Sequence, residues 1–397
     1  MSDTQKHTTP NVPNLRFPGF EDEWEKHTLG EIGEPYIGLT YSPTDVVSEG
    51  GVIVFRSSNI KDGEIDYCDI VRVNKKLKES LITRKDDLLI CARNGSPRLI
   101  GKNALLNEND ANQTFGAFML VYRSPENHFI HQLLSTKRYY SQVSENLGAR
   151  INQITTANIK DFEFLFPKGA DERDKISKFL DLIDQRIAIQ NKVIEDLKKL
   201  KTALGEKSIK QVHGVKIRLG DILDERNEKS TLNNQYEVLS STVTGIYSQR
   251  EYFNKDIAST NNSGYKIIRR GDIVFSPQNL WMGNINYNDR FENGIVSPSY
   301  KVFSIRKDFD AKYIAFLLKT KKALWTYSLV SEQGASIVRR NLNLESFLEI
   351  SFPIPSYIKQ KEIGDMISTV NSKLLLEQKL QNSLSRQKSY LLNSMFI

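Results

Sequence analysis

Short apolar runs bounded by Gly, Asn, Asp and Pro dominate two long stretches of the chain. The clearest of these runs are 52–55 and 117–122 in the first stretch and 272–275 and 300–303 in the second. Runs of this length between turn residues predict β-strands. Amphipathic helices are expected among them at 130–140 and 313–320. Each stretch is therefore predicted to fold as a mixed α/β domain.

A pattern of a different period follows each stretch, over 172–209 and 359–396, and neither segment contains proline. Apolar residues recur there at alternating spacings of four and three, as in a long helix with one apolar seam. The seam residues are Ile176, Leu180, Ile183, Ile187, Ile194, Leu197 and Leu204, and then Ile363, Ile367, Val370, Leu374, Leu384 and Leu391. Two matching seams in one chain predict an antiparallel coiled coil that holds the two domains apart.

The two halves of the chain are copies of one unit. Segments of the first half recur in the same order in the second: 29–32 as 219–222, 55–59 as 238–242, 84–90 as 269–275, 148–151 as 334–337, and 163–167 as 349–353. The long helical segments align at an offset of 187 residues, which places Ile176 on Ile363. Collinear repetition of this kind indicates duplicated architecture. The predicted organisation is a flexible tail 1–13, a first domain 14–168, a first helix 169–212, a second domain 213–354 and a second helix 355–397.

Composition narrows the possible locations and partners. No run approaches the roughly 18 apolar residues that span a bilayer, and the polar N-terminus lacks the apolar core of a secretory signal. The two cysteines, Cys68 and Cys91, both lie in strand-like stretches and are expected to be buried. Such sparse cysteine usage favours a reducing cytoplasm. The formal net charge of +7 favours an acidic partner, whether nucleic acid, an acidic protein or a membrane surface.

Motifs for catalysis are absent from the sequence. There is no GxGxxG, GxxxxGK[ST] or HExxH. Segment 33–36 only partly resembles the tetrapeptide that amine methylation requires, since it lacks the leading amide or carboxylate and the first proline. The acidic run 224–229 could imitate a nuclease metal site, but runs of this kind are usually solvated loops. His128 and His131 have no evident third ligand. We therefore expect no catalytic residue, no metal and no bound cofactor.

Two turn-rich loops after the third pair of matched segments carry many hydrogen-bonding side chains. The residues concerned are Arg93, Asn94, Ser96, Arg98 and Lys102 in the first copy, and Gln278, Asn279, Trp281 and Asn284 in the second. Arg suits bidentate bonding to guanine, and Asn or Gln to adenine, while Lys and Ser commonly hold phosphate. Composition alone also allows a plain polar hairpin loop. Equivalent placement with different side chains favours the reading of two different half-sequences.

A second candidate segment precedes the closing strand of each copy. Its polar residues are Arg150, Gln153 and Thr155 in the first copy, and Arg339 and Arg340 in the second. These side chains could clamp backbone phosphates. A surface loop that balances nearby acidic residues is the alternative.

Several features in combination resemble the specificity subunit of type I restriction-modification systems. They are 13–20 with Trp24, the Leu-Gly-Glu/Asp-Ile segments, the run 94–96 with 100–102, and the Phe-Pro pairs that lead into the long helices. The second copy departs from the pattern at 278–281, where the first has its Gly-Ser loop. The resemblance implies two target recognition domains, each reading one half of a split sequence in double-stranded DNA, with the paired helices setting the gap.

The resemblance also implies partners. Two methyltransferase subunits would bring S-adenosylmethionine, and ATP-dependent restriction subunits would complete the complex, while this chain would be non-catalytic. A rival interpretation from the residues is a scaffold that binds other proteins through its two domains and oligomerises through its helices. Retention on duplex DNA that falls steeply as salt rises separates the two hypotheses.

Overall fold

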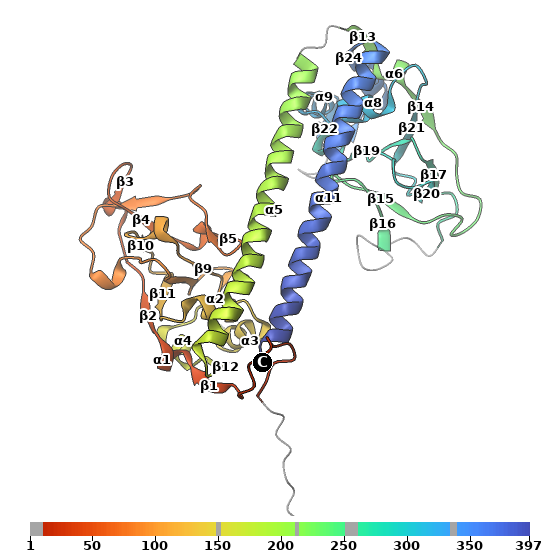
Figure 1. Cartoon of the computed structure of the whole chain (residues 1–397). Helices are drawn as coiled ribbons and strands as arrows, with labels where there is room; N and C mark the ends of the chain where they lie inside the picture. Colours follow the sequence, from red (N-terminus) through yellow and green to blue (C-terminus); the bar gives the residue numbers. More distant parts are fainter. Residues whose placement is uncertain (1–10, 148–151, 211–213, 251–260, 334–339) are drawn as a thin grey trace, which may run out of the picture. The chain divides into compact units, whose positions relative to one another are not determined.

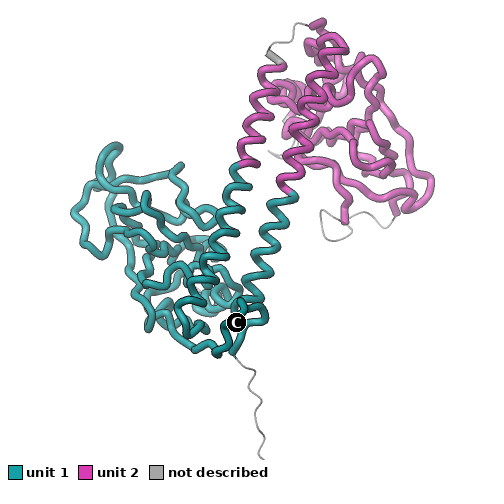
Figure 2. The backbone as a smooth tube through the Cα atoms, in the orientation of Figure 1, with its two compact units in different colours: residues 1–192, 379–397 teal, residues 193–378 magenta. Residues whose placement is uncertain are grey.

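The computed structural model describes residues 11–147, 152–210, 214–250, 261–333 and 340–397. The chain divides into two compact units (Figures 1 and 2). Unit 1 comprises 1–192 and 379–397, and unit 2 comprises 193–378. Each unit therefore contains part of both long helices, α5 (Ala170–Lys210) and α11 (Tyr357–Met395). Arg150 and Arg339 lie outside the described residues.

Unit 1 is built on a four-stranded antiparallel sheet in the order β2-β11-β8-β9. These strands are Glu34–Ile37, Met119–Arg123, Leu88–Cys91 and Asn103–Leu105. A second sheet, β10-β4-β7-β3, comprises Thr114–Phe115, Val52–Phe55, Val71–Val73 and Val46–Val47. The strand pairs are β1 (Glu25–Thr28) with β12 (Glu163–Phe166), and β5 (Ile60–Lys61) with β6 (Glu64–Ile65). The helices before α5 are α1 (Leu29–Ile32), α2 (Asn127–Leu133), α3 (Lys137–Glu145) and α4 (Thr156–Asp161).

Unit 2 repeats the main sheet in the equivalent order, β14-β21-β18-β19. These strands are Leu223–Arg226, Lys301–Ile305, Ile273–Phe275 and Ile285–Tyr287. The strand pairs are β13 (Val215–Arg218) with β24 (Ser351–Ile354), β15 (Leu239–Ser241) with β16 (Ile246–Ser248), β17 (Lys266–Arg269) with β20 (Asn293–Val296), and β22 (Ser331–Gln333) with β23 (Arg340–Leu342). The helices are α6 (Leu219–Ile222), α8 (Ala311–Leu317), α9 (Lys321–Leu329) and α10 (Leu344–Glu349). The prediction of two tandem mixed α/β domains is confirmed.

The repeated Leu-Gly-Glu/Asp-Ile segment forms the short helices α1 and α6. Leu29 and Leu219 are fully buried, and their amides donate to the carbonyls of Phe162 at 2.9 Å and Ile350 at 2.8 Å. A Cβ at Gly30 would come within 2.9 Å of the Lys160 Cβ atom. The leucine therefore anchors the segment in the core, and the glycine lets it approach the residues just before the closing strand.

The aspartate of the third repeated segment holds the turn before the central strand of each unit. The Asp87 carboxylate accepts from the Arg84 amide at 2.9 Å, and Asp272 does the same for Arg269 at 2.7 Å. Both carboxylates are buried, and each binds a guanidinium from its own sheet, that of Arg123 or Arg226. This shared role explains why the aspartate recurs in both copies.

The helix expected at 130–140 is interrupted, so that prediction was wrong. α2 ends at Leu133, and α3 begins at Lys137 after Thr136, whose hydroxyl accepts from the Tyr139 amide at 3.4 Å. Unit 2 has the same break, with the Thr320 hydroxyl accepting from the Ala323 amide at 3.2 Å. Threonine satisfies a free amide at a helix start better than it continues a helix. The helix therefore breaks at a capping threonine, although the apolar pattern continues through that position.

The two cysteines differ in their surroundings. Cys91 is buried in β8 as expected, whereas Cys68 is exposed, so the prediction for Cys68 was wrong. Its amide donates to the Asp66 carboxylate at 2.9 Å, which places Cys68 in a turn instead of a strand. No helix in the described ranges of the chain has the length and apolar character needed to cross a membrane.

The long helices pair in antiparallel fashion inside each unit. In unit 1, Ile176 near the start of α5 and Leu391 near the end of α11 belong to one hydrophobic core. In unit 2, Leu204 near the end of α5 packs against the core that contains Ile363 and Ile367 from the start of α11. The beginning of each helix thus lies with the end of the other, as an antiparallel pair requires. The predicted pairing is confirmed in these segments.

A polar network lies between the helices and α2 in unit 1. The buried Gln132 amide donates to the carboxylates of Asp181 at 2.8 Å and Asp184 at 2.9 Å. Lys388 of α11 forms an ion pair with Asp184. His128 bonds to Asp181, which raises the pKa of this histidine. Every strong charge in the network therefore has an opposite charge beside it.

His131 should make the stability of unit 1 depend on pH. Burial, and then the positive charge of Lys388, lower the pKa of His131 from its ordinary value near 6.5 to about 4. Unfolding therefore takes up a proton between these values, and the free energy of unfolding should fall as pH drops through this window. His128 acts oppositely, because its raised pKa favours the folded state at low pH.

The variant His131→Ala isolates this effect, since unit 2 carries Ala315 at the equivalent position. We expect urea unfolding of the variant between pH 7 and pH 4.5 to depend less steeply on pH than that of the parent chain. Equal pH dependence in the two proteins would contradict the assignment.

Candidate nucleic-acid interface

The two candidate segments of unit 1 form one continuous surface. The loop that leaves β8 is bonded to the segment before α4: the Ile154 amide donates to the Ala92 carbonyl at 2.9 Å, and Arg93 pairs with Gln153 as a β-bridge. The Asn152 amide group also donates to the Gly95 carbonyl at 3.3 Å. Segments that are separate in the sequence thus present their polar residues together.

Arg93 is the best-placed candidate in unit 1 for contacting a base. Its side chain is exposed, and its guanidinium carbon lies 5.0 Å from the centre of the Phe118 ring. Stacking on an aromatic face fixes the plane of a guanidinium and leaves its N–H donors at the edges. Arg98, in the short turn Pro97–Leu99, is also exposed. Neither arginine forms an ion pair with any described residue.

The other predicted residues of unit 1 hold the surface in shape. The side-chain amide group of Asn94 donates to the Ser57 hydroxyl at 3.0 Å. The side-chain oxygen of Asn94 accepts from the backbone amide of Ser96 at 3.0 Å. The Lys102 ammonium donates to the Ile60 carbonyl. Thr155 caps α4, with its hydroxyl accepting from the Asn158 amide at 3.1 Å. Gln153 is half-buried in its bridge.

Unit 2 joins its two candidate segments in a similar way. The Arg340 amide donates to the Gln278 carbonyl at 3.0 Å, which ties β23 to the loop after β18. The Arg340 guanidinium carbon lies 4.6 Å from the centre of the Trp281 ring, and the guanidinium also donates to the Ser328 carbonyl at 3.1 Å. Both units therefore place an arginine on an aromatic ring where loop and segment meet.

Asn284 has no face available for a base. It is only 4% exposed, and its side-chain oxygen accepts from the Ser241 hydroxyl at 2.8 Å. Asn279 starts a short turn over Leu280–Met282 and is half-buried, with its carbonyl accepting from the Met282 amide at 3.1 Å. Gln278 is exposed. The accessible polar side chain of this loop is thus Gln278, at its beginning.

One exposed aromatic residue of these surfaces, and two serines that hold candidate side chains in place, were missed in the sequence. Phe118 is 56% exposed, although it lies in an apolar run predicted to be a strand. β11 begins only at Met119, and the preceding Gly116-Ala117 pair is the signal that could have marked a turn. Ser57 and Ser241, which hold Asn94 and Asn284, carry no comparable signal because they are distant in the chain.

The exposed polar side chains of the surface are hydrogen-bond donors and acceptors. Cys91 ends β8 just before the loop, and burial raises its pKa to about 11, so the thiol stays protonated. Among the described residues, no group of three or more His, Cys, Asp or Glu side chains could hold a metal ion. The exposed groups are donors and acceptors on rigid supports, which can recognise a ligand by hydrogen bonds.

A family model described as the type I restriction modification DNA specificity domain matches residues 21–199 and again 214–386. The chain belongs to this family and carries two copies of its domain. The resemblance drawn from the sequence is therefore confirmed, and the two matched segments correspond to the internal repeat.

Individual relatives agree with this assignment. The chain is 27% identical over 193 residues to the type I restriction enzyme StySPI specificity subunit of Salmonella potsdam, a match that spans 46% of this chain and 41% of that protein. The crystal structure of the type-I restriction-modification system S subunit from M. genitalium has the same fold, with 17% sequence identity and a TM-score of 0.65. That likeness covers 97% of this chain and 99% of the other.

Proposed function

We propose that this chain is the DNA-sequence-specificity subunit of a type I restriction-modification complex. Each unit reads one half of a bipartite site in double-stranded DNA, and the paired helices set the gap. The observation that carries the proposal is the joining of loop and segment in both units. The Arg93–Gln153 bridge in unit 1 and the Arg340–Gln278 bond in unit 2 unite polar residues on similar frameworks with different side chains.

The exposed side chains suit the reading of base edges. Arg93 and Arg98 offer guanidinium donors for guanine, and Gln278 offers an amide for adenine. Arg340 stacks on Trp281 and turns part of its guanidinium to a carbonyl, which suits a phosphate contact or a structural role. The domain boundaries that we propose for the two readers are 14–168 and 213–354.

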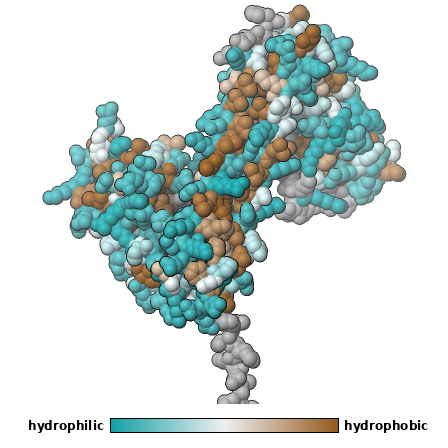
Figure 3. All heavy atoms as spheres, in the orientation of Figure 1, coloured by the Kyte–Doolittle hydropathy of each residue, from teal (hydrophilic) through white to brown (hydrophobic). Residues whose placement is uncertain are grey.

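The proposed partners are two methyltransferase subunits and ATP-dependent restriction subunits, with chemistry and cofactors on those partners. Support comes from apolar side chains that remain exposed on the long helices (Figure 3). Leu182 and Ile189 of α5 are 63% and 65% exposed, and Leu376 of α11 is 61% exposed. In each unit, exposed apolar side chains of this kind offer other proteins a place to dock. Because its substrate is DNA, we place the complex in the cytoplasm.

Retention on immobilised duplex DNA at increasing salt tests the proposal against the protein-scaffold alternative. A chain that neutralises phosphates loses affinity steeply between roughly 50 and 200 mM salt. We expect this steep loss, and we expect a duplex with the recognised site to compete better than one without it. Retention that is independent of salt, or no retention with the methyltransferase subunits present, would favour the scaffold.

Shortening both helices should shorten the gap. Deleting 186–192 and the equivalent 373–379 removes one heptad from each helix and keeps the antiparallel register. Seven residues span roughly 10 Å of helix, equal to about three base pairs. We expect the spacer in the recognised sequence to change by about this amount, with both half-sequences unchanged, as measured by sequencing of selected duplexes.

A single deletion serves as the control for the spacer. Removing 186–192 alone makes α5 one heptad shorter than α11, so the pair of Asp184 with Lys388 in unit 1 and the packing of Leu204 in unit 2 cannot both be kept. This variant should be destabilised without acquiring a new spacing. A double deletion that folds and still selects the original gap would refute the spacer role.

A further inference from the structure

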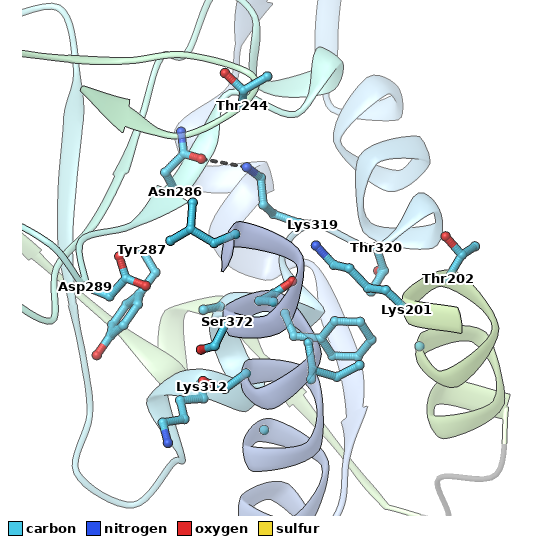
Figure 4. A pocket seen from close by; sticks show the side chains of 18 of the residues that line it. Lys201, Thr202, Thr244, Asn286, Tyr287, Asp289, Lys312, Lys319, Thr320 and Ser372 are labelled. Carbon is cyan, nitrogen blue, oxygen red and sulfur yellow. Dashed lines mark hydrogen bonds between the residues drawn. The ribbon is translucent and has the colours of Figure 1, made fainter. Parts of the chain in front are cut away.

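Unit 2 contains a cavity of about 1160 Å³ whose lining includes several lysines, among them Lys201, Lys312 and Lys319 (Figure 4). It lies among the end of α5, the start of α11 and the turn between α8 and α9. The basic residues that line it are Lys201, Arg270, Lys312, Lys319, Lys321 and Lys322. The acidic residues in the lining are Glu206, which pairs with Lys321, and Asp289. Positive charge is therefore in excess.

Arg270 and Lys312 pair with Glu292 and Asp365, which lie outside the lining. The lining cations without an ion pair to a described residue are Lys201, Lys319 and Lys322, of which Lys201 and Lys319 matter here. The Lys319 ammonium donates to the Asn286 side-chain oxygen at 2.6 Å and to the Val243 carbonyl at 3.1 Å, which are both neutral acceptors. Partial desolvation, and then the charge of Lys201, lower the pKa of Lys319 to about 8. Burial also lowers the pKa of Lys201. Neither lysine forms an ion pair with another residue in the described part of the chain.

The equivalent place in unit 1 contains two carboxylates that unit 2 lacks. The 187-residue offset that aligns the long helices places Lys201 on Lys388, which has the carboxylate of Asp184 as its partner. The same offset places Asn371 on Asp184, and Ser368 on Asp181. Both Asn371 and Ser368 line the cavity. Unit 2 has thus kept the lysine and replaced the two carboxylates by neutral residues.

The turn between the helices adds a further cation in unit 2. The segments 133–137 and 317–321 read Leu-Leu-Ser-Thr-Lys and Leu-Leu-Lys-Thr-Lys, so Lys319 occupies the place of Ser135. The start of α9, with Thr320 as its cap, also lines the cavity. The positive end of a helix dipole favours an anion at this position.

We propose that this cavity binds a phosphate group, held by Lys201 and Lys319. The negative charge of the phosphate takes the place that the carboxylates of Asp181 and Asp184 fill in unit 1. The volume suits a phosphorylated compound of nucleotide size. The hydroxyl of Ser372 in the lining is a further donor to phosphate oxygens. The phosphate belongs either to a free compound of this kind or to the backbone of nucleic acid.

Asn371→Asp tests the proposal, because it restores in the lining of the cavity the carboxylate that Asp184 supplies in unit 1. Asn382→Asp is the matched control, since it makes the same charge change at an exposed position of α11 outside the cavity. Thermal unfolding of the full chain is followed with inorganic phosphate, with ATP and with AMP. Phosphate also stabilises proteins unspecifically by exclusion from their surface, so the readout is the difference between the two variants.

We expect saturating ligand to raise the Tm of the parent chain and of the control variant Asn382→Asp by several degrees. Asn371→Asp should have a higher Tm without ligand and lose the specific rise, and Lys319→Met should lose the rise as well. An equal rise in Asn371→Asp and Asn382→Asp, or no rise in the parent chain with any of the probes or with duplex DNA, would overturn the proposal.

A second arm identifies the source of the phosphate. Duplex DNA without the recognised site is titrated against the same variants. A response to ATP or AMP, with equal DNA affinity in Asn371→Asp and Asn382→Asp, assigns the site to a free compound. Weaker binding of every duplex by Asn371→Asp assigns it to the nucleic-acid backbone. These variants leave the loops after β8 and β18 unchanged. The selectivity of each variant for a DNA sequence therefore tests the proposed function separately from the phosphate site.

Discussion

Alanine at Arg93, Asn94 and Arg98 is expected to abolish discrimination in one half of the DNA site and leave the other half unchanged. The two arginines are exposed and free of ion pairs within the described residues, and Arg93 is oriented by Phe118. Each good bidentate contact to a base contributes about 1–3 kcal/mol of discrimination. Loss of two such contacts should therefore reduce selectivity at that half-site by roughly a hundredfold or more.

The mirrored replacement in unit 2 provides the control. Alanine at Gln278 and Arg340 should impair the other half-site, because these residues belong to the equivalent surface. Both variants are measured by competition binding with duplexes randomised in one half at a time. Equal loss in both halves, or no loss in either, would contradict the assignment of the loops.

Loss of the Asp87 carboxylate is expected to destabilise unit 1 by about 3–5 kcal/mol, as is usual when one partner of a buried ion pair is removed. Asp87 is 3% exposed and binds the Arg123 guanidinium through contacts of 2.9 Å and 3.0 Å. Its loss leaves the part-buried Arg123 without its carboxylate and frees the Arg84 amide of the turn. The sheet that carries the loop after β8 should therefore open more readily.

The neighbouring Asp86 gives a matched comparison. Asp86→Asn should cost under about 1 kcal/mol, because its pair with His128 is half exposed. Asparagine also tolerates the positive φ of 64° at this position. Hydrogen exchange in β8 and β11 reports on unit 1 specifically. Equal protection in Asp87→Asn and Asp86→Asn would contradict the structural role of the buried pair.

The sequence was sufficient to predict the duplicated framework. Strand spacing, the Leu-Gly-Glu/Asp-Ile segments and the helical seams depend on local period and on burial, which repeat in both copies. The break before α3 was not predictable from the apolar period, because the Thr136 hydroxyl competes with helix continuation. Cys68 was misplaced for a similar reason, since the Asp66 side chain forms a turn there.

The roles of individual loop residues could not be predicted from composition. Lys102 and Asn284 have the side chains of a DNA-binding loop, yet one donates to the Ile60 carbonyl and the other is buried against Ser241. These partners lie 42 and 43 residues away in the chain. Only the tertiary fold determines which polar side chains form hydrogen bonds within the protein and which remain exposed. We therefore propose that recognition depends most on the exposed Arg93, Arg98 and Gln278.

Methylome sequencing tests the central claim most directly. Cells that express this chain with a methyltransferase subunit of the same system are compared with cells that express the methyltransferase alone. We predict methylation at two short defined half-sequences separated by a gap of fixed length and no defined sequence, and only when this chain is present. Methylation at one continuous sequence, or methylation that does not depend on this chain, would contradict the assignment of one half-site to each unit.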